Sequence, residues 1–318
     1  MHHQSQEILV LKQRHFLSLS DYSSFDIKLL LDTADEMKKH PKQFRKALKG
    51  QILIMIFELP FFRTRISFES GMSHLGGTTQ VLASEDIRLD WDEPISDTAA
   101  VLSRYVDGIM VRTSQHQTVL DLAEHGTVPV LNGLTDLEYP CQALADLQTL
   151  REKFGRLEGL KLTYIGDGNN MAHALLHATA RTGMECTLIM PRAEHYQCLP
   201  EIVERAREDH EKQGTRLHIT DDLNAARGSH VVYTDTWVSM GREADRVQRI
   251  DAFRGYSVTQ EVMDLAGPNA VFMHCLPAYR GYEVMPEVID GPQSIVFDQA
   301  ENRMWSQMAV MYHLMAEA

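Results

Sequence analysis

The sequence predicts an α/β fold in which two doubly wound parallel sheets are joined by interdomain helices. Short apolar runs such as GQILIMIFE (50–58) are typical of strands that are buried on both faces. Helical patterns separate these runs, and this alternation indicates parallel strands that are covered by helices. The alternation stops at one long helical pattern (139–159) and then starts again. Two sheets therefore explain the chain better than one very large sheet.

The expected elements can be placed in chain order. The first helix covers 23–40 behind a serine cap, and the first strand lies in 50–58. The other strands of the first sheet are expected at 78–83, 107–113 and 127–133, with helices near 62–75, 94–105 and 116–125. After the long helix, strands are expected within 161–170, 185–191, 216–220, 230–235 and 270–277.

A chain of 318 residues is long enough for two domains of ordinary size. We place the first domain at 1–148 and the second at 149–301, and we expect the C-terminal helix, about 302–318, to pack back on the first domain. The whole helical pattern covers 299–318, and its methionines at 304, 308, 311 and 315 share one face. Such a stripe indicates core packing.

The formal net charge of −13 disfavours nucleic acids and anionic membranes as partners. Any anion that this protein binds must therefore meet local positive charge. The four cysteines have no Cys-x-x-Cys spacing, which argues against a zinc site and against a dense disulfide framework. The N-terminus does not resemble a signal peptide, and no apolar stretch approaches the roughly 18 residues of a membrane helix. We expect a cytoplasmic protein with reduced thiols.

One candidate anion site lies at the start of the helix expected near 62–75. Arg63, Thr64 and Arg65 occupy its first turn, where unpaired backbone N–H groups and the helix dipole favour negative charge. Arginine adds a planar fork of donors that matches phosphate or carboxylate. On spacing alone, arginines that only cap the helix and form salt bridges are an equally good explanation.

Other polar residues follow apolar strands, and ligands of open parallel sheets collect at the carboxyl ends of strands. These residues are Arg112, Asn169 with Asn170, Asp235 with Ser239, and His274 with Cys275. The loop GDGNN lacks the third glycine of a dinucleotide motif, so it does not predict a dinucleotide site.

Seven segments in the same order resemble the ornithine carbamoyltransferases, from about residue 7 to the C-terminus. They are FRTRISFE, DTAAVLSRYVDGIMVRT, YPCQALADLQTL, GDGNNMAH, YTDTWVSMG, MHCLPAYRG and ENRM. The resemblance implies a homotrimer with active sites between subunits, a carbamoyl-phosphate domain followed by an ornithine-binding domain, and no metal or organic cofactor. The implied reaction, part of arginine metabolism, carbamoylates the side-chain amine of ornithine and gives citrulline and phosphate.

The resemblance also assigns roles to individual residues. Those expected to act in catalysis are Arg112, Gln142, Asp235, Cys275 and Arg303. Those expected around the carbamoyl donor are Phe61, Phe62, Arg63, Thr64, Arg65, Arg88, Arg112, Tyr139, Gln142, Cys275, Leu276 and Arg303. Those expected around the amino-acid acceptor are Asn170, Asp235, Ser239 and Met240, with Asp235 accepting from the α-ammonium group.

Several donor-site positions depart from the family pattern. Phe61 and Phe62 replace the Ser and Thr of Ser-Thr-Arg-Thr-Arg, Tyr139 replaces the His of His-Pro-Cys-Gln, and Arg88 stands where a Gln usually comes from the neighbouring subunit. The acceptor motifs are intact, which favours a donor pocket that is more apolar and more dependent on arginine. Two alternatives are a paralogue with a modified donor and a non-catalytic paralogue that binds an amino acid or a partner protein.

Overall fold

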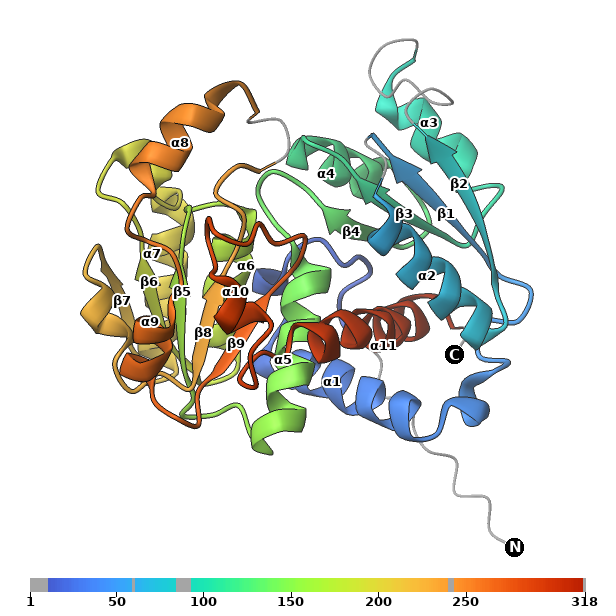
Figure 1. Ribbon diagram of the computed structural model, residues 1–318. Helices are drawn as coiled ribbons and strands as arrows, with labels where there is room; N and C mark the ends of the chain where they lie inside the picture. Colours follow the sequence, from blue (N-terminus) through green and yellow to red (C-terminus); the bar gives the residue numbers. More distant parts are fainter. Residues whose placement is uncertain (1–10, 59–60, 84–92, 240–242, 317–318) are drawn as a thin grey trace, which may run out of the picture. The chain divides into compact units, whose positions relative to one another are not determined.

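The computed structural model describes residues 11–58, 61–83, 93–239 and 243–316. The chain forms two compact units, Met1–Thr135 with Met304–Ala318 and Asp136–Arg303. Figure 1 shows that each unit has its own parallel sheet with helices around it. The predicted α/β class with two parallel sheets is confirmed. Among the described residues, no helix has both the length and the apolar character that a membrane span requires.

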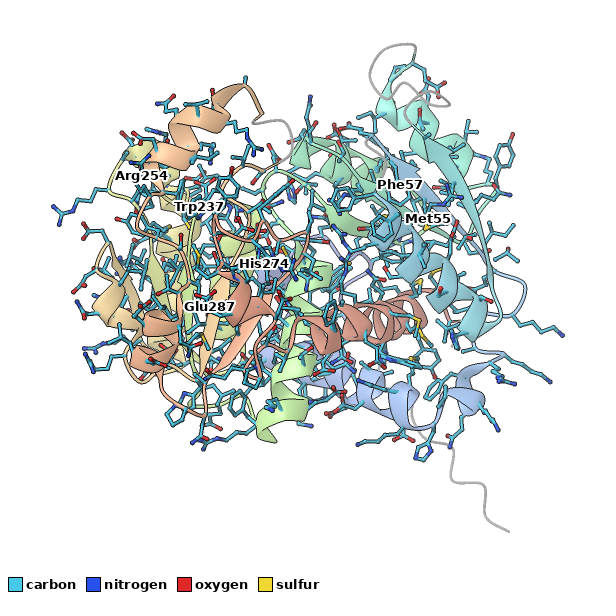
Figure 2. All side chains as sticks on the ribbon, in the orientation of Figure 1. Met55, Phe57, Trp237, Arg254, His274 and Glu287 are labelled. Carbon is cyan, nitrogen blue, oxygen red and sulfur yellow. The ribbon has the colours of Figure 1, made fainter. Side chains whose placement is uncertain are left out.

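The sheet of the first unit has four parallel strands in the order β2-β1-β3-β4. The strands are β1 (Ile52–Phe57), β2 (Thr78–Ala83), β3 (Gly108–Arg112) and β4 (Val130–Leu134). From β1 the chain moves outward to β2, and it then crosses back to β3 on the other side of β1. The carboxyl ends of β1 and β3 therefore form a topological switch point, where open α/β sheets bind ligands. Met55 and Phe57 mark β1 in Figure 2.

Helices cover both faces of this first sheet. On one face, α3 (Ile95–Leu102) and α4 (His116–His125) pack on isoleucines and valines of β1 and β3. Two further helices of this unit are α1 (Ser24–Lys39) and α2 (Phe62–Leu75). The expected serine cap of the first helix is confirmed, because the Ser23 side chain accepts from the Asp26 backbone N–H in a capping box.

The C-terminal helix α11 (Val296–Met315) begins before the expected residue 299. Its methionine face packs on the first unit, as expected. A Cβ atom added to Gly71 of α2 would lie 3.0 Å from side-chain atoms of Met308 and Met311, and one added to Gly108 would lie 3.0 Å from Met315. The absence of a side chain at these two glycines lets α11 approach α2 and β3 closely.

The sheet of the second unit has five parallel strands in the order β7-β6-β5-β8-β9. The strands are β5 (Lys161–Ile165), β6 (Glu185–Ile189), β7 (Leu217–Thr220), β8 (Val231–Thr234) and β9 (Val271–His274). Every strand of both sheets overlaps a range that the sequence predicted. The direction of winding reverses between β5 and β8, so their carboxyl ends form a second switch point.

The helices of the second unit are α5 (Pro140–Phe154), α6 (Asn170–Arg181), α7 (Pro200–Lys212), α8 (Arg246–Ala252), α9 (Gln260–Ala266) and α10 (Pro286–Ile289). One face of the sheet packs on α9 and α10 through a core that includes Ile165, Val232 and Phe272. The short 3-10 helices of the chain are η1 (Leu19–Asp21), η2 (Pro41–Phe44), η3 (Glu194–Tyr196), η4 (Leu223–Ala226) and η5 (Glu243–Asp245).

The glycine-rich loop after β5 serves backbone packing. A Cβ atom on Gly168 would lie 2.2 Å from the backbone of Gln197 and Cys198, and the Gly168 N–H donates to the Tyr196 carbonyl at 2.8 Å. Only glycine permits so close an approach of two backbone segments. The glycine therefore has a structural cause that does not involve a bound nucleotide.

Candidate functional site

Hydrogen bonds to Glu58, which directly follows β1, stabilise the switch point of the first unit. Its carboxylate accepts from the Thr113 hydroxyl at 2.6 Å and from the Ser114 backbone N–H at 2.8 Å, both just beyond β3. The Ser114 hydroxyl donates to the same carboxylate at 2.9 Å. These bonds fix the two strand ends relative to one another, so the side chains that follow β1 and β3 share one edge of the sheet.

Arg112, the last residue of β3, is a buried cation at this switch point. Its side chain is only 4% exposed, and its Nη1 donates to the Thr64 hydroxyl at 2.9 Å. The Phe61 ring lies against the guanidinium group, with 3.6 Å between the guanidinium carbon and the ring centroid. A cation over an aromatic face gains about 0.5–2 kcal/mol, depending on its desolvation. Phe61 and Thr64 therefore hold the Arg112 fork in one orientation.

The remaining residues of the FFRTR stretch lie on the first turn of α2. Phe61 is the N-cap residue of this helix, and its own side chain makes no capping hydrogen bond. The Arg63 guanidinium lies 4.9 Å from the centroid of the exposed Phe62 ring. Arg65 is exposed and pairs with Glu69 at 3.0 Å, one turn along the helix. The positive end of the helix dipole, with arginines close by, makes this turn a suitable place for an anion.

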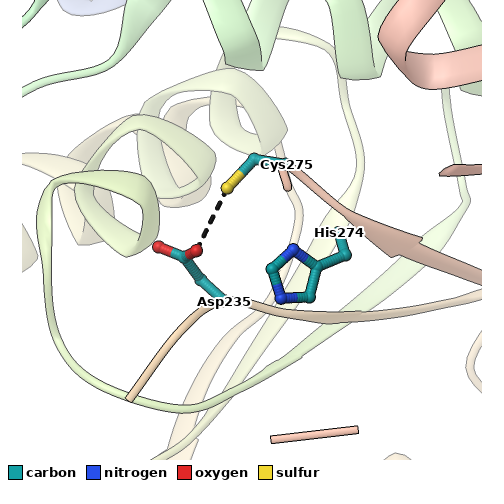
Figure 3. Close-up of side chains that lie close together, drawn as sticks. All are labelled: Asp235, His274 and Cys275. Atoms are coloured by element: carbon teal, nitrogen blue, oxygen red, sulfur yellow. Dashed lines mark hydrogen bonds between the residues drawn. The ribbon is translucent and has the colours of Figure 1, made fainter. Parts of the chain in front are cut away.

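At the switch point of the second unit, Asp235 directly follows β8 and is 8% exposed. Asn169 Nδ2 donates to its Oδ2 at 2.8 Å, and the Thr236 backbone N–H donates to its Oδ1 at 2.8 Å. Figure 3 shows that the Cys275 thiol points at the same carboxylate, with 3.1 Å between Sγ and Oδ1. A buried carboxylate that is oriented in this way is suited to an ammonium group.

Cys275 is partnered by Asp235, and its sequence neighbour His274 is engaged elsewhere. The Leu276 backbone N–H donates to His274 Nδ1 at 2.9 Å, so the ring proton is on Nε2, which faces Glu283 Oε1 at 3.3 Å. Burial, and then the Asp235 charge, raise the pKa of the Cys275 thiol well above its ordinary value. The thiol therefore stays protonated near pH 7, which excludes a thiolate nucleophile activated by His274.

The same three side chains bring possible metal-ligand atoms within 4.8 Å of one another. Both His274 nitrogens already face hydrogen-bond partners, and the thiol proton faces Asp235. Cys275 and Asp235 thus satisfy each other, and His274 is satisfied by Glu283 and the Leu276 N–H; binding a metal would break these bonds.

Three of the residues expected around the carbamoyl group, Tyr139, Gln142 and Arg303, lie at the start of α5 and on the first half of α11. Tyr139 is the buried N-cap residue of α5, and Gln142, in its first turn, is fully buried. Arg303 on α11 is 3% exposed, and its guanidinium carbon lies 5.6 Å from the centroid of the Tyr139 ring. This packing is the same kind of cation–π contact that Phe61 makes with Arg112.

Of the other predicted site residues, three lie in described segments and two do not. Asn170 opens α6, and Ser239 is half-buried in the loop after β8. Leu276 has a φ of 58°, a left-handed conformation that a non-glycine residue adopts at a cost and that is frequent at ligand sites. Arg88 and Met240 lie outside the described residues.

The structure gives a part in the site to three residues that have no role in the resemblance. The sequence predicts Asn169 at a strand end, and the resemblance assigns the acceptor role to Asn170. Asn169 caps α6 by accepting from two backbone N–H groups, and it also orients Asp235. The strong preference of asparagine for N-caps was a signal for this position. Asp146 and Gln299 are buried polar residues in contact with each other, and no local pattern marks them.

Comparisons with known proteins agree with this arrangement. Residues 14–152 match the family model for the carbamoyl-P binding domain of aspartate/ornithine carbamoyltransferase, and residues 158–314 match the model for its Asp/Orn binding domain. The chain is 50% identical over 309 residues to an ornithine carbamoyltransferase of Symbiobacterium thermophilum, covering 96% of this chain and 99% of that protein. It is 49% identical over 305 residues to the one of Methanothermobacter thermautotrophicus, covering 96% and 99%.

Solved structures of ornithine carbamoyltransferases are also similar to this chain. The ornithine carbamoyltransferase of Pyrococcus furiosus superposes with a TM-score of 0.94 at 43% identity, covering 98% of this chain and 100% of that one. The one of Gloeobacter violaceus superposes with a TM-score of 0.86 at 39% identity, covering 95% and 99%. Both family domains are matched in order, and relatives near 50% identity match almost the full length. The chain therefore belongs to the aspartate/ornithine carbamoyltransferase family.

Proposed function

We propose that this protein transfers the carbamoyl group of carbamoyl phosphate to the side-chain amine of ornithine, giving citrulline and phosphate. The observation that carries the proposal is the chemistry of the two switch points: one presents buried and helix-terminal cations, and the other a buried, oriented carboxylate. The first matches an anionic donor, and the second matches the ammonium group of an amino acid. The relatives near 50% identity carry the name ornithine carbamoyltransferase, which supports this acceptor.

The donor is held by Arg63, Thr64 and Arg112 at its phosphate and carbonyl oxygens, and by Gln142 at its amide. The amine nitrogen of ornithine attacks the carbamoyl carbon and forms the new C–N bond. The C–O bond to phosphate then breaks with its electron pair on the leaving phosphate, which takes up the proton that the nitrogen loses. Arg112 and Arg303 stabilise the charge that develops on the carbonyl oxygen, so catalysis depends mainly on positioning and electrostatics.

The acceptor is held by Asp235 at its α-ammonium group, with Asn170, Ser239 and Met240 as further contacts. Cys275 and the Leu276 backbone lie near the reacting amine. The protonated thiol orients the Asp235 carboxylate.

Phe61 supports the donor site through Arg112. A phenylalanine cannot donate to phosphate as the serine of the family pattern does. The Phe61 ring instead fixes the buried guanidinium at 3.6 Å, so that the Arg112 fork replaces part of the lost hydrogen bonding. The donor pocket is therefore more apolar and depends more on arginine than the usual one.

Replacing Phe61 by leucine keeps an apolar side chain but removes the aromatic face below Arg112. The KM for carbamoyl phosphate should rise about 2- to 30-fold, which corresponds to a cation–π energy of about 0.5–2 kcal/mol. Phe62→Leu is the matched control: that ring is 66% exposed and lies against Arg63, so its effect should stay under about fivefold. Tighter donor binding in the double variant Phe61→Ser, Phe62→Thr would instead mean that the rings only obstruct the site.

Further parts of the proposal rest on the sequence and the family. The carbamoyl-phosphate domain covers 1–148 with the C-terminal helix from about 302, and the ornithine domain covers 149–301. The active unit is a homotrimer with active sites at subunit interfaces, to which Arg88 contributes. The protein works in the cytoplasm, a location that suits its four free cysteines. No metal or organic cofactor takes part.

A colorimetric citrulline assay with carbamoyl phosphate and ornithine tests the function directly. Saturable citrulline formation is expected, together with calorimetric heat for both substrates. Ornithine binding without any heat from millimolar carbamoyl phosphate would refute the proposed donor and favour a paralogue with a modified donor. Absence of turnover with every carbamoyl-type donor tried would favour a non-catalytic paralogue. Neither alternative is favoured by the relatives described above.

A further inference from the structure

A buried polar chain in the second unit links the proposed carbamoyl ligand to the Cys275 loop. Its centre is Asp146 on α5, which is 1% exposed and lies one helical turn after the fully buried Gln142. Gln142 Nε2 donates to Asp146 Oδ1 at 2.8 Å. Gln299 Nε2, from α11, donates to the same oxygen at 2.7 Å. One carboxylate oxygen thus collects two amide donors.

The carboxylate determines which way the Gln142 amide points. An ionised carboxylate only accepts hydrogen bonds, so the amide nitrogen must face Asp146 and the amide oxygen must face away. Among the described residues, this oxygen, Gln142 Oε1, is buried without a hydrogen-bond partner. A buried acceptor of this kind matches the N–H of a carbamoyl group.

The same reasoning applies to Gln299. Its amide nitrogen donates to Asp146 and, at 3.0 Å, to the Tyr233 hydroxyl. Its oxygen Oε1 therefore faces the opposite way and accepts from the His274 backbone N–H at 3.0 Å. His274 ends β9 and directly precedes Cys275. Asp146 thereby ties α5 to the strand end that carries Cys275.

We propose that Asp146 is a positioning residue for carbamoyl transfer, which sets the Gln142 amide with its oxygen toward the donor and, through Gln299, fixes the backbone that carries Cys275. This inference rests on the proposed function, because it takes carbamoyl phosphate as the donor. Asp146 acts through other residues, so a test has to separate positioning from simple packing.

Asp146 has a pKa close to neutral pH. Burial raises its pKa to about 7, while hydrogen bonds from Gln142, Gln299 and Tyr233 and the positive charge of Arg303 oppose this rise. The other titratable groups that act on it electrostatically are the Tyr233 hydroxyl and the Cys275 thiol, and the pKa of each is raised well above its ordinary value. Asp146 is therefore the member of this cluster that changes charge near pH 7.

This raised pKa predicts a pH dependence with a definite sign. Below pH about 7 the Asp146 carboxyl group is protonated and can donate to an amide oxygen, so it no longer enforces one orientation of the Gln142 amide. We expect kcat/KM for carbamoyl phosphate to rise with pH through about 7. For stability the sign is opposite, because the folded protein binds this proton more tightly than the unfolded chain. The contribution of Asp146 to stability is present at low pH and is lost as pH rises toward about 7.

The first test is Asp146→Asn, which keeps the shape but gives Gln142 a partner that can donate as well as accept. The KM for carbamoyl phosphate should rise about 5- to 150-fold at pH 8, because a buried N–H that loses its acceptor costs about 1–3 kcal/mol. The KM for ornithine should change far less. The rise of kcat/KM through pH 7 should disappear, and comparing both proteins at each pH removes the titration of the substrates.

The second test is a rescue that only the orientation argument predicts. In the double variant Gln142→Glu, Asp146→Asn, the new asparagine can donate to the new carboxylate, whose second oxygen again faces the donor, and the net charge is unchanged. Donor KM should recover relative to both single variants, whereas independent packing defects would add up. Thr149→Val is the matched control. Thr149 accepts from Asn302 at 3.0 Å on the same two helices, so its loss should lower the Tm and leave donor KM unchanged.

Two outcomes would overturn the inference: a double variant no better than the single ones, or a donor KM that rises as much in Thr149→Val. The titration of Asp146 can also be measured without turnover, which separates a failure of the Asp146 inference from a failure of the proposed function. Infrared difference spectra between the wild-type protein and Asp146→Asn isolate the band of the protonated Asp146 carboxyl group. This band should disappear as pH rises through about 7, and Gln299→Leu should move the midpoint of its disappearance to higher pH. An unmoved midpoint contradicts the hydrogen-bond chain, even if the wild-type protein forms no citrulline.

Discussion

Replacing Arg112 by glutamine is expected to lower kcat/KM for carbamoyl phosphate by about 10²- to 10⁴-fold. This range corresponds to two hydrogen bonds to a charged group at about 1.5–3 kcal/mol each. The expected loss is this large because Arg112 is 4% exposed and fixed by Phe61 and Thr64, so the free protein already holds its fork in place. Initial rates over a range of carbamoyl phosphate at saturating ornithine measure the effect.

Arg112→Lys separates charge from geometry. Lysine keeps the positive charge but cannot present a planar fork or stack its head group on Phe61 in the same way. We expect lysine to recover only part of the loss, leaving about a 10- to 100-fold deficit, equivalent to one charge-assisted hydrogen bond. Arg104→Lys is the control: Arg104 is exposed after α3, donates to the Ala100 carbonyl and has no proposed role. Full recovery by Arg112→Lys would show that a point charge is sufficient and that the Phe61 stack has no function.

Much of the fold could be predicted because local signals agree with one another. The apolar run of β1 and the serine cap of α1 each specify their own structure without help from distant residues. Strand ends also indicated where Arg112 and Asp235 would lie, because parallel strands bring their carboxyl ends to one edge of a sheet. For the same reason both switch points could be anticipated from the alternation of elements.

Contacts between distant segments could not be predicted in this way. The sequence suggests His274 as a neighbour for Cys275, but the thiol meets Asp235, which is 40 positions away along the chain. Asp146 and Gln299 are separated by 153 positions, and their hydrogen bond depends on how α5 and α11 pack. The replacement of Ser by Phe61 showed only that a hydroxyl was lost. That the ring supports Arg112 follows from the geometry at the end of β3.

Asp235→Asn is expected to lower kcat/KM for ornithine by about 30- to several-thousand-fold, since removing one partner of a buried charge pair costs about 2–5 kcal/mol. Asparagine has nearly the same shape, and one oxygen can still accept from Asn169 or from the Thr236 N–H. The loss should therefore appear with ornithine as the varied substrate, while donor KM stays within about threefold. Asp222→Asn, at an exposed carboxylate that accepts from the Asn224 N–H, is the control for removing an acidic charge from the same unit.

Asp235→Asn also has a predicted effect that does not depend on turnover. The Asp235 charge and its bond to the thiol proton help to raise the pKa of Cys275, so removing the charge must lower this pKa and increase the thiolate fraction at pH 8. Alkylation of Cys275 by iodoacetamide, followed by mass spectrometry, should be faster in Asp235→Asn than in the wild-type protein. Faster alkylation with an unchanged kcat/KM for ornithine would confirm the Asp235–Cys275 contact but reject Asp235 as the residue that binds the ammonium group. An unchanged alkylation rate would contradict the contact itself.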